Sequence, residues 1–269
     1  MLEVISMFHV RKVCDEGTNS PFINRMMLNI CQIRDAALPR SEHLLFDEKH
    51  DRIYKSLYEC RSHVLSTYDI LCDYANAVNQ GSVITIQNRT FSVNETIDDE
   101  LRSHFNGFMN SGIRAYKDVQ ELTKSFGLDI SALYGKEANF NSLINHLEAD
   151  NQKDLSVFLR SVRRSWGESF TDLRNQMEHA GWQLGELGYT LVGNEVAVTL
   201  PHILDKDCFE YMKYVFCQLA VFAESMIVYV LQMKNTNLVL EMNNQPWVIQ
   251  FNEVHDETLL YRGQVKGRE

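Results

Sequence analysis

The chain has 269 residues, of which 45% are hydrophobic, and these values exclude an intrinsically disordered protein. Only 4 prolines and 13 glycines occur, so long helices can run without interruption. The formal net charge is −10, and a surface that is acidic on every side repels nucleic acid, so an RNA-binding function requires a local basic patch.

The first half of the chain predicts three helices, one hairpin and a short strand. Pro21 suits the first turn of a helix, and the residue before Pro39 is disfavoured in one, so a helix is expected between them. Apolar residues then recur at helical spacing in two longer segments, and two short strand-like runs lie between these segments. We expect an edge strand at 1–13, helices at 22–37, 41–79 and 96–126, and a hairpin at 83–93.

The second half predicts three more helices and a second hairpin. Gly127 ends the preceding helix, and an irregular segment follows it. The tail alternates like strands around Asn243 and Asn244, and its last residues are charged. We expect helices at 141–149, 154–180 and 208–233, a hairpin at 189–199, strands within 237–251, and loose chain at 255–269.

The helix at 208–233 is apolar enough to raise the question of a membrane span. Its most apolar run is only about 17 residues long and has Glu224 in the middle. The helix also carries polar residues at heptad spacing, namely Gln218, Ser225 and Gln232. A central helix of a bundle, or a helix at a dimer interface, is therefore favoured over a span.

These elements predict a mainly α fold, namely a helical bundle with small β-hairpin insertions. We find no repeat, low-complexity tract or linker, so we expect a single domain over residues 1–269, with core helices at about 41–79, 96–126, 152–180 and 205–233. No secretion signal is expected at the first residues. The six cysteines form no C-x-x-C pair and fall mostly within helical patterns, which favours reduced, buried thiols and a cytoplasmic location.

The helix at 154–180 carries the most informative residues. At about 100° per residue, its apolar side chains share one arc, which is expected to face the core. This arc contains Leu155, Phe158, Leu159, Val162, Trp166, Phe170, Leu173 and Met177. Arg160, Arg163, Arg164 and Arg174 collect on its flank and far side and form a basic stripe, which is the clear candidate for a local positive patch.

Arg174 and His179 stand near the end of this helix, just before Gly181. An arginine keeps its charge, and a histidine ordinarily titrates near neutral pH, so the two side chains suit phosphodiester chemistry. Five residues apart, they point about 140° away from each other on a regular helix. They converge if the last turn is distorted, if the arginine side chain swings round, or if two copies of the helix share their residues.

The sequence Arg174-Asn175-Gln176-Met177-Glu178-His179 resembles the Arg-x(4–6)-His signature of the HEPN superfamily of helical ribonucleases, in which Asn often follows the arginine. The resemblance implies a helical bundle, frequent dimerisation with facing motifs, and metal-independent RNA cleavage through the 2′-hydroxyl. It also implies a role as a toxin or in antiviral defence, with a regulatory or antitoxin protein as a partner. One toxin branch has Tyr two residues after the histidine, and Gly181 stands there instead, which argues against that branch.

The resulting hypothesis gives each polar residue of the motif a role. His179 acts as general base or general acid, Arg174 binds the scissile phosphate, and Asn175 orients the phosphate or the imidazole. Glu178 either tunes His179 or pairs with Arg174 and restrains it. Arg160, Arg163 and Arg164 hold flanking phosphates, and no metal or cofactor takes part.

One alternative remains open, and a second is set aside. An ordinary surface arginine, followed by a histidine that interacts favourably with the helix dipole, would give the same motif. In that case the chain is a non-catalytic helical module that binds a protein or a nucleotide. His43, His50 and Asp51 invite a metal-dependent phosphohydrolase reading, but they form no complete set of ligands, so we interpret them as solvated helix residues.

Overall fold

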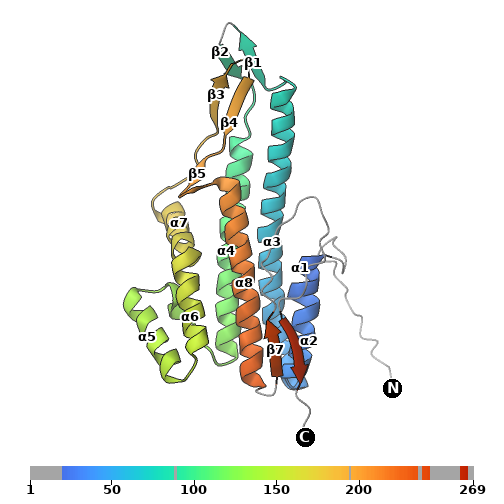
Figure 1. Cartoon of the computed structure of the whole chain (residues 1–269), viewed down its shortest axis with the longest axis vertical. Helices are drawn as coiled ribbons and strands as arrows, with labels where there is room; N and C mark the ends of the chain where they lie inside the picture. The colour runs from blue at the N-terminus through green and yellow to red at the C-terminus, as the bar shows by residue number, and fades with distance from the viewer. Residues whose placement is uncertain (1–19, 88–89, 194, 236–237, 243–260, 266–269) are drawn as a thin grey trace, which may run out of the picture.

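The computed structural model describes residues 20–87, 90–193, 195–235, 238–242 and 261–265, with side chains up to residue 235. These residues form a mainly α fold with small two-stranded sheets, as the sequence predicts (Figure 1). The expected strand at 1–13 lies outside the described residues. The helical elements are α1 (Pro21–Ile23), η1 (Asn24–Asn29), α2 (Ile30–Ala37), α3 (Arg40–Asn79), α4 (Asp98–Ser125), η2 (Ser131–Tyr134), α5 (Glu137–Ala149), α6 (Lys153–Val162), η3 (Arg163–Gly167), α7 (Glu168–His179) and α8 (Cys208–Lys234).

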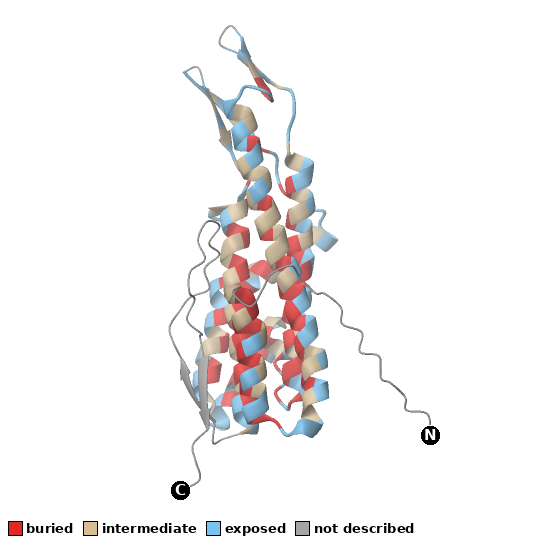
Figure 2. Cartoon of the chain, turned by 90° about the vertical axis from the view of Figure 1, so that its right-hand side faces the viewer, coloured by how far each residue is buried: buried red, intermediate tan, exposed pale blue. Residues whose placement is uncertain are grey.

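Three long helices run side by side along the molecule. α8 packs against α2, α3 and α4, and α6 and α7 lie on the other side of α4 from α3 (Figure 1). The buried side chains concentrate where these helices face one another, and the far end of the molecule is mostly exposed (Figure 2). Within the part of the chain that is described, α8 is the one helix long and apolar enough to cross a membrane, yet 67% of its apolar window is buried inside the protein. This burial confirms the prediction of a central core helix.

An ion pair lies inside this core. Arg25, in the π-helical turn η1, donates a hydrogen bond of 2.6 Å from Nη2 to the Glu224 carboxylate on α8, and both side chains are fully buried. The charged residue in the middle of the most apolar helix therefore has a partner of opposite charge, as a buried carboxylate requires.

Two hairpins extend from one end of the bundle, as expected. β1 (Ile84–Gln87) pairs with β2 (Thr90–Val93), and β3 (Gly188–Val192) pairs with β4 (Glu195–Thr199), both antiparallel. The hydroxyls of Tyr74 on α3 and Tyr189 on β3 are 2.8 Å apart and connect the second hairpin to the bundle. A two-residue ladder, β5 (His202–Ile203) with β6 (Lys206–Asp207), leads into α8, where the Asp207 carboxylate accepts the Glu210 N–H.

The local structure differs from the sequence predictions in five places. The segment expected to be irregular after Gly127 contains the 3₁₀ turn η2, and α5 begins at Glu137 rather than near residue 141. β7 (Leu238–Met242) pairs with β8 (Tyr261–Val265), so part of the tail expected to be loose is a strand. The motif helix contains a π-helical turn, η3, where a regular α-helix was expected. His50 is buried against Phe46 rather than solvated, with ring centroids 5.5 Å apart.

The described cysteines are all free thiols. Cys60 and Cys208 are buried, and Cys31, Cys72 and Cys217 are half-buried. Burial raises the pKa of the Cys208 thiol to about 12, so this group stays protonated and unreactive at neutral pH. Cys14 lies outside the described residues.

Candidate active site at the end of α7

α6, η3 and α7 form one continuous helix from Lys153 to His179, close to the predicted range. Its apolar arc packs against the core as expected, with Trp166 and Phe170 almost fully buried. Trp166 contacts Phe170 and Phe222, which joins this helix to α8. The hydrophobic face therefore fixes which side of the helix remains for polar groups.

The π-helical turn at η3 changes how the two ends of this helix relate to each other. A π-helical turn holds an additional residue, so side chains on α6 and α7 no longer keep the 3.6-residue register. The Tyr134 hydroxyl lies against Gly167 in this turn, where a Cβ would overlap it. The basic stripe predicted from a regular wheel is thus divided into separate parts.

Arg163 is the first residue of η3, and its guanidinium faces inward. Nη1 donates to the carbonyl oxygens of Leu133 at 3.2 Å and Gly135 at 3.3 Å. Nη2 donates to Glu168 at 3.3 Å, and the group also lies over the ring of Phe140. Arg163 therefore ties η2 and α5 to the motif helix, and we leave it out of the candidate phosphate-binding set.

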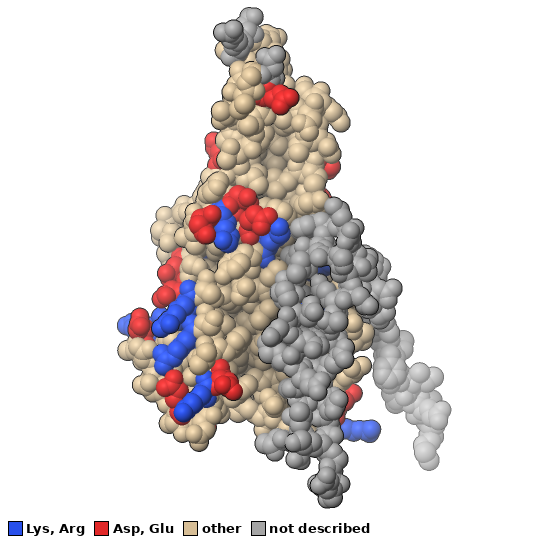
Figure 3. Space-filling model, in the orientation of Figure 1, with Lys and Arg blue, Asp and Glu red and all other residues tan. Residues whose placement is uncertain are grey.

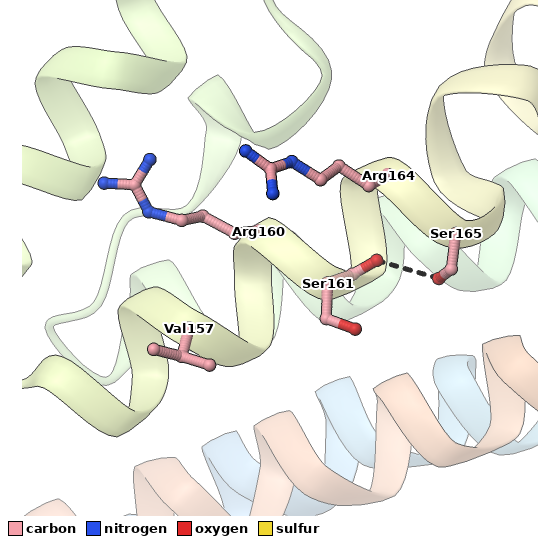
Figure 4. Close-up of a pocket in the computed structure, with 5 residues that line it drawn as sticks. All are labelled: Val157, Arg160, Ser161, Arg164 and Ser165. Atoms are coloured by element: carbon pink, nitrogen blue, oxygen red, sulfur yellow. Dashed lines mark hydrogen bonds between the residues drawn. The ribbon is translucent and has the colours of Figure 1, made fainter.

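Arg160 and Arg164 line a groove of about 410 Å³ together with Val157, Ser161 and Ser165. Lys and Arg side chains lie on this flank of the molecule, interleaved with Asp and Glu side chains (Figure 3). Figure 4 shows the two guanidinium groups extending to the same side of the helix, with the Ser165 hydroxyl donating to the Ser161 carbonyl. Arg160 donates to Glu148 at 3.1 Å, whereas Arg164 is exposed. Of the predicted stripe, these two arginines are the pair that can meet an anion together.

Arg174 and His179 are brought together through Glu178. The Arg174 guanidinium forms an ion pair with Glu178 Oε1, one helical turn further on. The other carboxylate oxygen of Glu178 lies 3.8 Å from Nε2 of His179. The His179 side chain is 75% exposed, and Asn175 is exposed as well. The Glu178 carboxylate is thus paired with the guanidinium to which the hypothesis assigns the phosphate. Pairing with Arg174 is one of the two roles considered for Glu178.

The chain turns sharply after His179. Gly181 has a φ of 69°, which a residue with a side chain adopts only under strain, and the Trp182 N–H donates to the Gln176 carbonyl at 3.2 Å. The ring of Trp182 packs against Phe105 on α4. The sequence prediction of Gly181 as the residue that ends the helix is confirmed.

The segment after this turn is tied to the beginning of α4. Nε of Arg102 donates to the Leu184 carbonyl at 3.0 Å, and the Leu187 N–H donates to Asp98 at 2.8 Å. Arg102 also lies 3.4 Å from Glu186. No sequence signal links Arg102 to Leu184, 82 positions later, because this contact depends on how the segment after α7 packs against α4.

The geometry suits anion binding and proton transfer. Among the described residues, no group of three or more His, Cys, Asp or Glu side chains is arranged to hold a metal ion. The motif itself offers one guanidinium, one exposed imidazole and one competing carboxylate. A phosphate that approached Arg174 would have to compete with the Glu178 carboxylate for the guanidinium.

No protein-family model matches the chain, and comparisons with curated proteins and with solved structures give no match either. The fold and the motif geometry are thus the observations that bear on function.

Proposed function

We propose that this protein is a HEPN-type endoribonuclease that cleaves RNA through the 2′-hydroxyl without a metal ion. The observation that carries the proposal is the placement of Arg174 and the exposed His179 around one carboxylate at the end of a bundle helix. Together they provide a fixed positive charge and a proton-transfer group on one surface, next to a turn anchored to α4.

In the proposed reaction, RNA reaches His179 with its phosphate on Arg174. The imidazole removes the proton of the 2′-hydroxyl, and the 2′-oxygen attacks the adjacent phosphorus. The 5′-oxygen of the next nucleotide leaves and takes a proton from water or from an imidazolium. Arg174 stabilises the charge that develops on the phosphate oxygens. The products are an RNA end with a 2′,3′-cyclic phosphate and an end with a 5′-hydroxyl.

A second copy of the chain would complete this arrangement. One neutral imidazole serves as the base, and an imidazolium from a facing motif serves as the acid, so that both proton transfers have a protein partner. Arg160 and Arg164 would contact phosphates further along the strand, since their guanidinium groups share one groove. A homodimer with facing motifs is therefore part of the proposal.

Cleavage of transfer RNA and total RNA by the purified protein in EDTA tests the proposal. We expect the wild-type protein to cut, and Arg174→Ala and His179→Ala to lose cleavage while keeping the wild-type melting temperature. His202→Ala is the matched control, because His202 is also exposed but lies on β5. Equal cleavage by His179→Ala and wild type would contradict the proposal.

A non-catalytic binding module is the second candidate, favoured by the occupation of Arg174 by Glu178 and by the net charge of −10. In that case the wild-type protein leaves RNA intact. Binding of a protein partner would then depend on exposed apolar side chains such as Leu44, which is 81% exposed at the start of α3. Leu44→Asp would abolish partner binding, and His179→Ala would not affect it.

A further inference from the structure

Two histidines that play no part in the proposed nuclease site face each other between α3 and α4. The Nδ1 atoms of His63 and His104 are 3.2 Å apart, and the ring centroids are 5.5 Å apart with an angle of 64° between the planes. Both side chains are half-buried. The pair therefore lies at the rim of the bundle, where solvent reaches it.

Gly107 provides the space for this pair. The imidazole of His63 lies against Gly107 on α4, and a Cβ at that position would overlap three ring atoms. A glycine inside a helix makes that helix less stable than alanine would. Gly107 therefore lowers the stability of α4 at the position where its missing side chain lets the His63 ring approach His104.

Burial and the neighbouring imidazole both favour the neutral form of His63. Desolvation and the proximity of His104 lower the pKa of His63, and Glu59 on α3 opposes this effect. Glu59 is itself paired with Arg114 on α4, so its charge is largely balanced. Neutral imidazoles have a lone pair available for a metal ion, whereas imidazolium groups do not.

We propose that His63 and His104 bind a divalent transition-metal ion such as Zn²⁺ through their Nδ1 atoms. Two nitrogens at about 2.0–2.1 Å from a tetrahedral zinc ion are about 3.3–3.4 Å apart, close to the spacing found here. The hydrogen bond between the rings is given up, and each ring then holds its proton on Nε2. Two protein ligands leave the remaining positions to water, so the site is an open one.

This site is independent of the proposed RNA chemistry. The ribonuclease proposal uses residues of α6, η3 and α7, and the metal pair belongs to α3 and α4. Cleavage in EDTA is still expected, because no step of the proposed reaction involves the metal. Failure of one proposal therefore leaves the other standing.

Calorimetric titration of the full chain with Zn²⁺ at pH 7.5 tests the metal site. We expect binding that weakens by at least about tenfold in His63→Gln and in His104→Gln. Gly107→Ala keeps both ligands but moves the His63 ring, so it should weaken binding too. His146→Ala is the control, because His146 is exposed on α5 and should leave the affinity unchanged. Melting curves establish that each variant folds.

A parallel titration with Ni²⁺ separates the histidines from the cysteines, because imidazole suits Ni²⁺ and thiolates favour softer ions. Affinity should fall as the pH is lowered, because protons compete with the metal ion for the imidazole nitrogens. Wild-type affinity in His104→Gln for both ions would overturn the proposal. So would the absence of any binding by wild type at about 1 mM metal.

Discussion

Arg25 and Glu224, 199 positions apart in the sequence, form an ion pair of 2.6 Å in the buried centre of the bundle. η1 supplies the arginine and α8 the carboxylate, so the pair joins the first helical segment to the last long helix. Removing one member leaves a buried charge without its partner, which costs more than the pair contributes as an intact unit.

We therefore expect Glu224→Ala to lower the free energy of unfolding by about 3–5 kcal/mol in chemical denaturation. Glu210→Ala on the same helix is the control, because Glu210 pairs with Lys213 at the surface and should change the stability by about 1 kcal/mol or less. Equal losses of unfolding free energy in the two variants would show that the buried ion pair stabilises the fold no more than the surface pair does.

His50 predicts how stability depends on pH. Burial lowers the pKa of His50 from 6.5 to about 4, so the folded protein keeps this ring neutral while the unfolded chain takes up a proton. The associated stability is complete above about pH 6.5 and is lost as the pH falls toward 4, by up to about 3 kcal/mol. His50→Gln should flatten this part of the stability profile. An unchanged slope between pH 6.5 and 4 would contradict the assignment.

The backbone conformation of Gly181, at the end of the motif helix, requires a residue without a side chain. Its φ of 69° is strained for any residue with a Cβ, so Gly181→Ala should destabilise the protein by about 1–2 kcal/mol. Gly185→Ala is the matched control in the same segment, since a Cβ there meets only Pro201 at an ordinary distance of 3.6 Å. Thermal melts of the two variants give the comparison, and a larger loss in Gly185→Ala would be inconsistent with this account.

Removing the charge of Glu178 should increase the affinity for RNA. The carboxylate competes with phosphate for Arg174, so Glu178→Gln should bind a single-stranded RNA several-fold more tightly at low salt. Asp172→Asn removes the same charge from an exposed position of α7 and controls for the change in net charge. Filter binding at several salt concentrations measures both. If the two variants gain equally, Glu178 has no specific effect on Arg174.

Hydrophobic periodicity was sufficient to predict most helices, because a face that must be buried repeats at 3.6 residues. Leu155, Phe170 and Leu173 therefore fall in the core as expected. Strand-like residues on either side of Gln87-Asn88 and of Gly193-Asn194 likewise predicted the two hairpins at the end of the bundle. These features depend on local sequence alone.

Features that depend on distant contacts were not predictable in the same way. The π-helical turn at η3 accommodates Tyr134 against Gly167 and turns Arg163 inward, so a regular wheel misplaced that arginine. The burial of His50 and its contact with Phe46 arise from how α3 packs. The sequence left open whether Glu178 tunes His179 or pairs with Arg174. The structure was needed to show that its carboxylate forms an ion pair with Arg174 and lies 3.8 Å from His179 Nε2.

The most direct test of the proposed chemistry compares one RNA cleavage site with the same site carrying a single 2′-deoxy nucleotide, in EDTA. We predict that wild type cuts the all-RNA strand to a 2′,3′-cyclic phosphate and a 5′-hydroxyl end, and leaves the 2′-deoxy strand intact. His179→Ala should leave both strands intact. Cleavage of the 2′-deoxy strand at the same rate, or products with a 5′-phosphate, would contradict attack by the 2′-hydroxyl and with it the proposed ribonuclease.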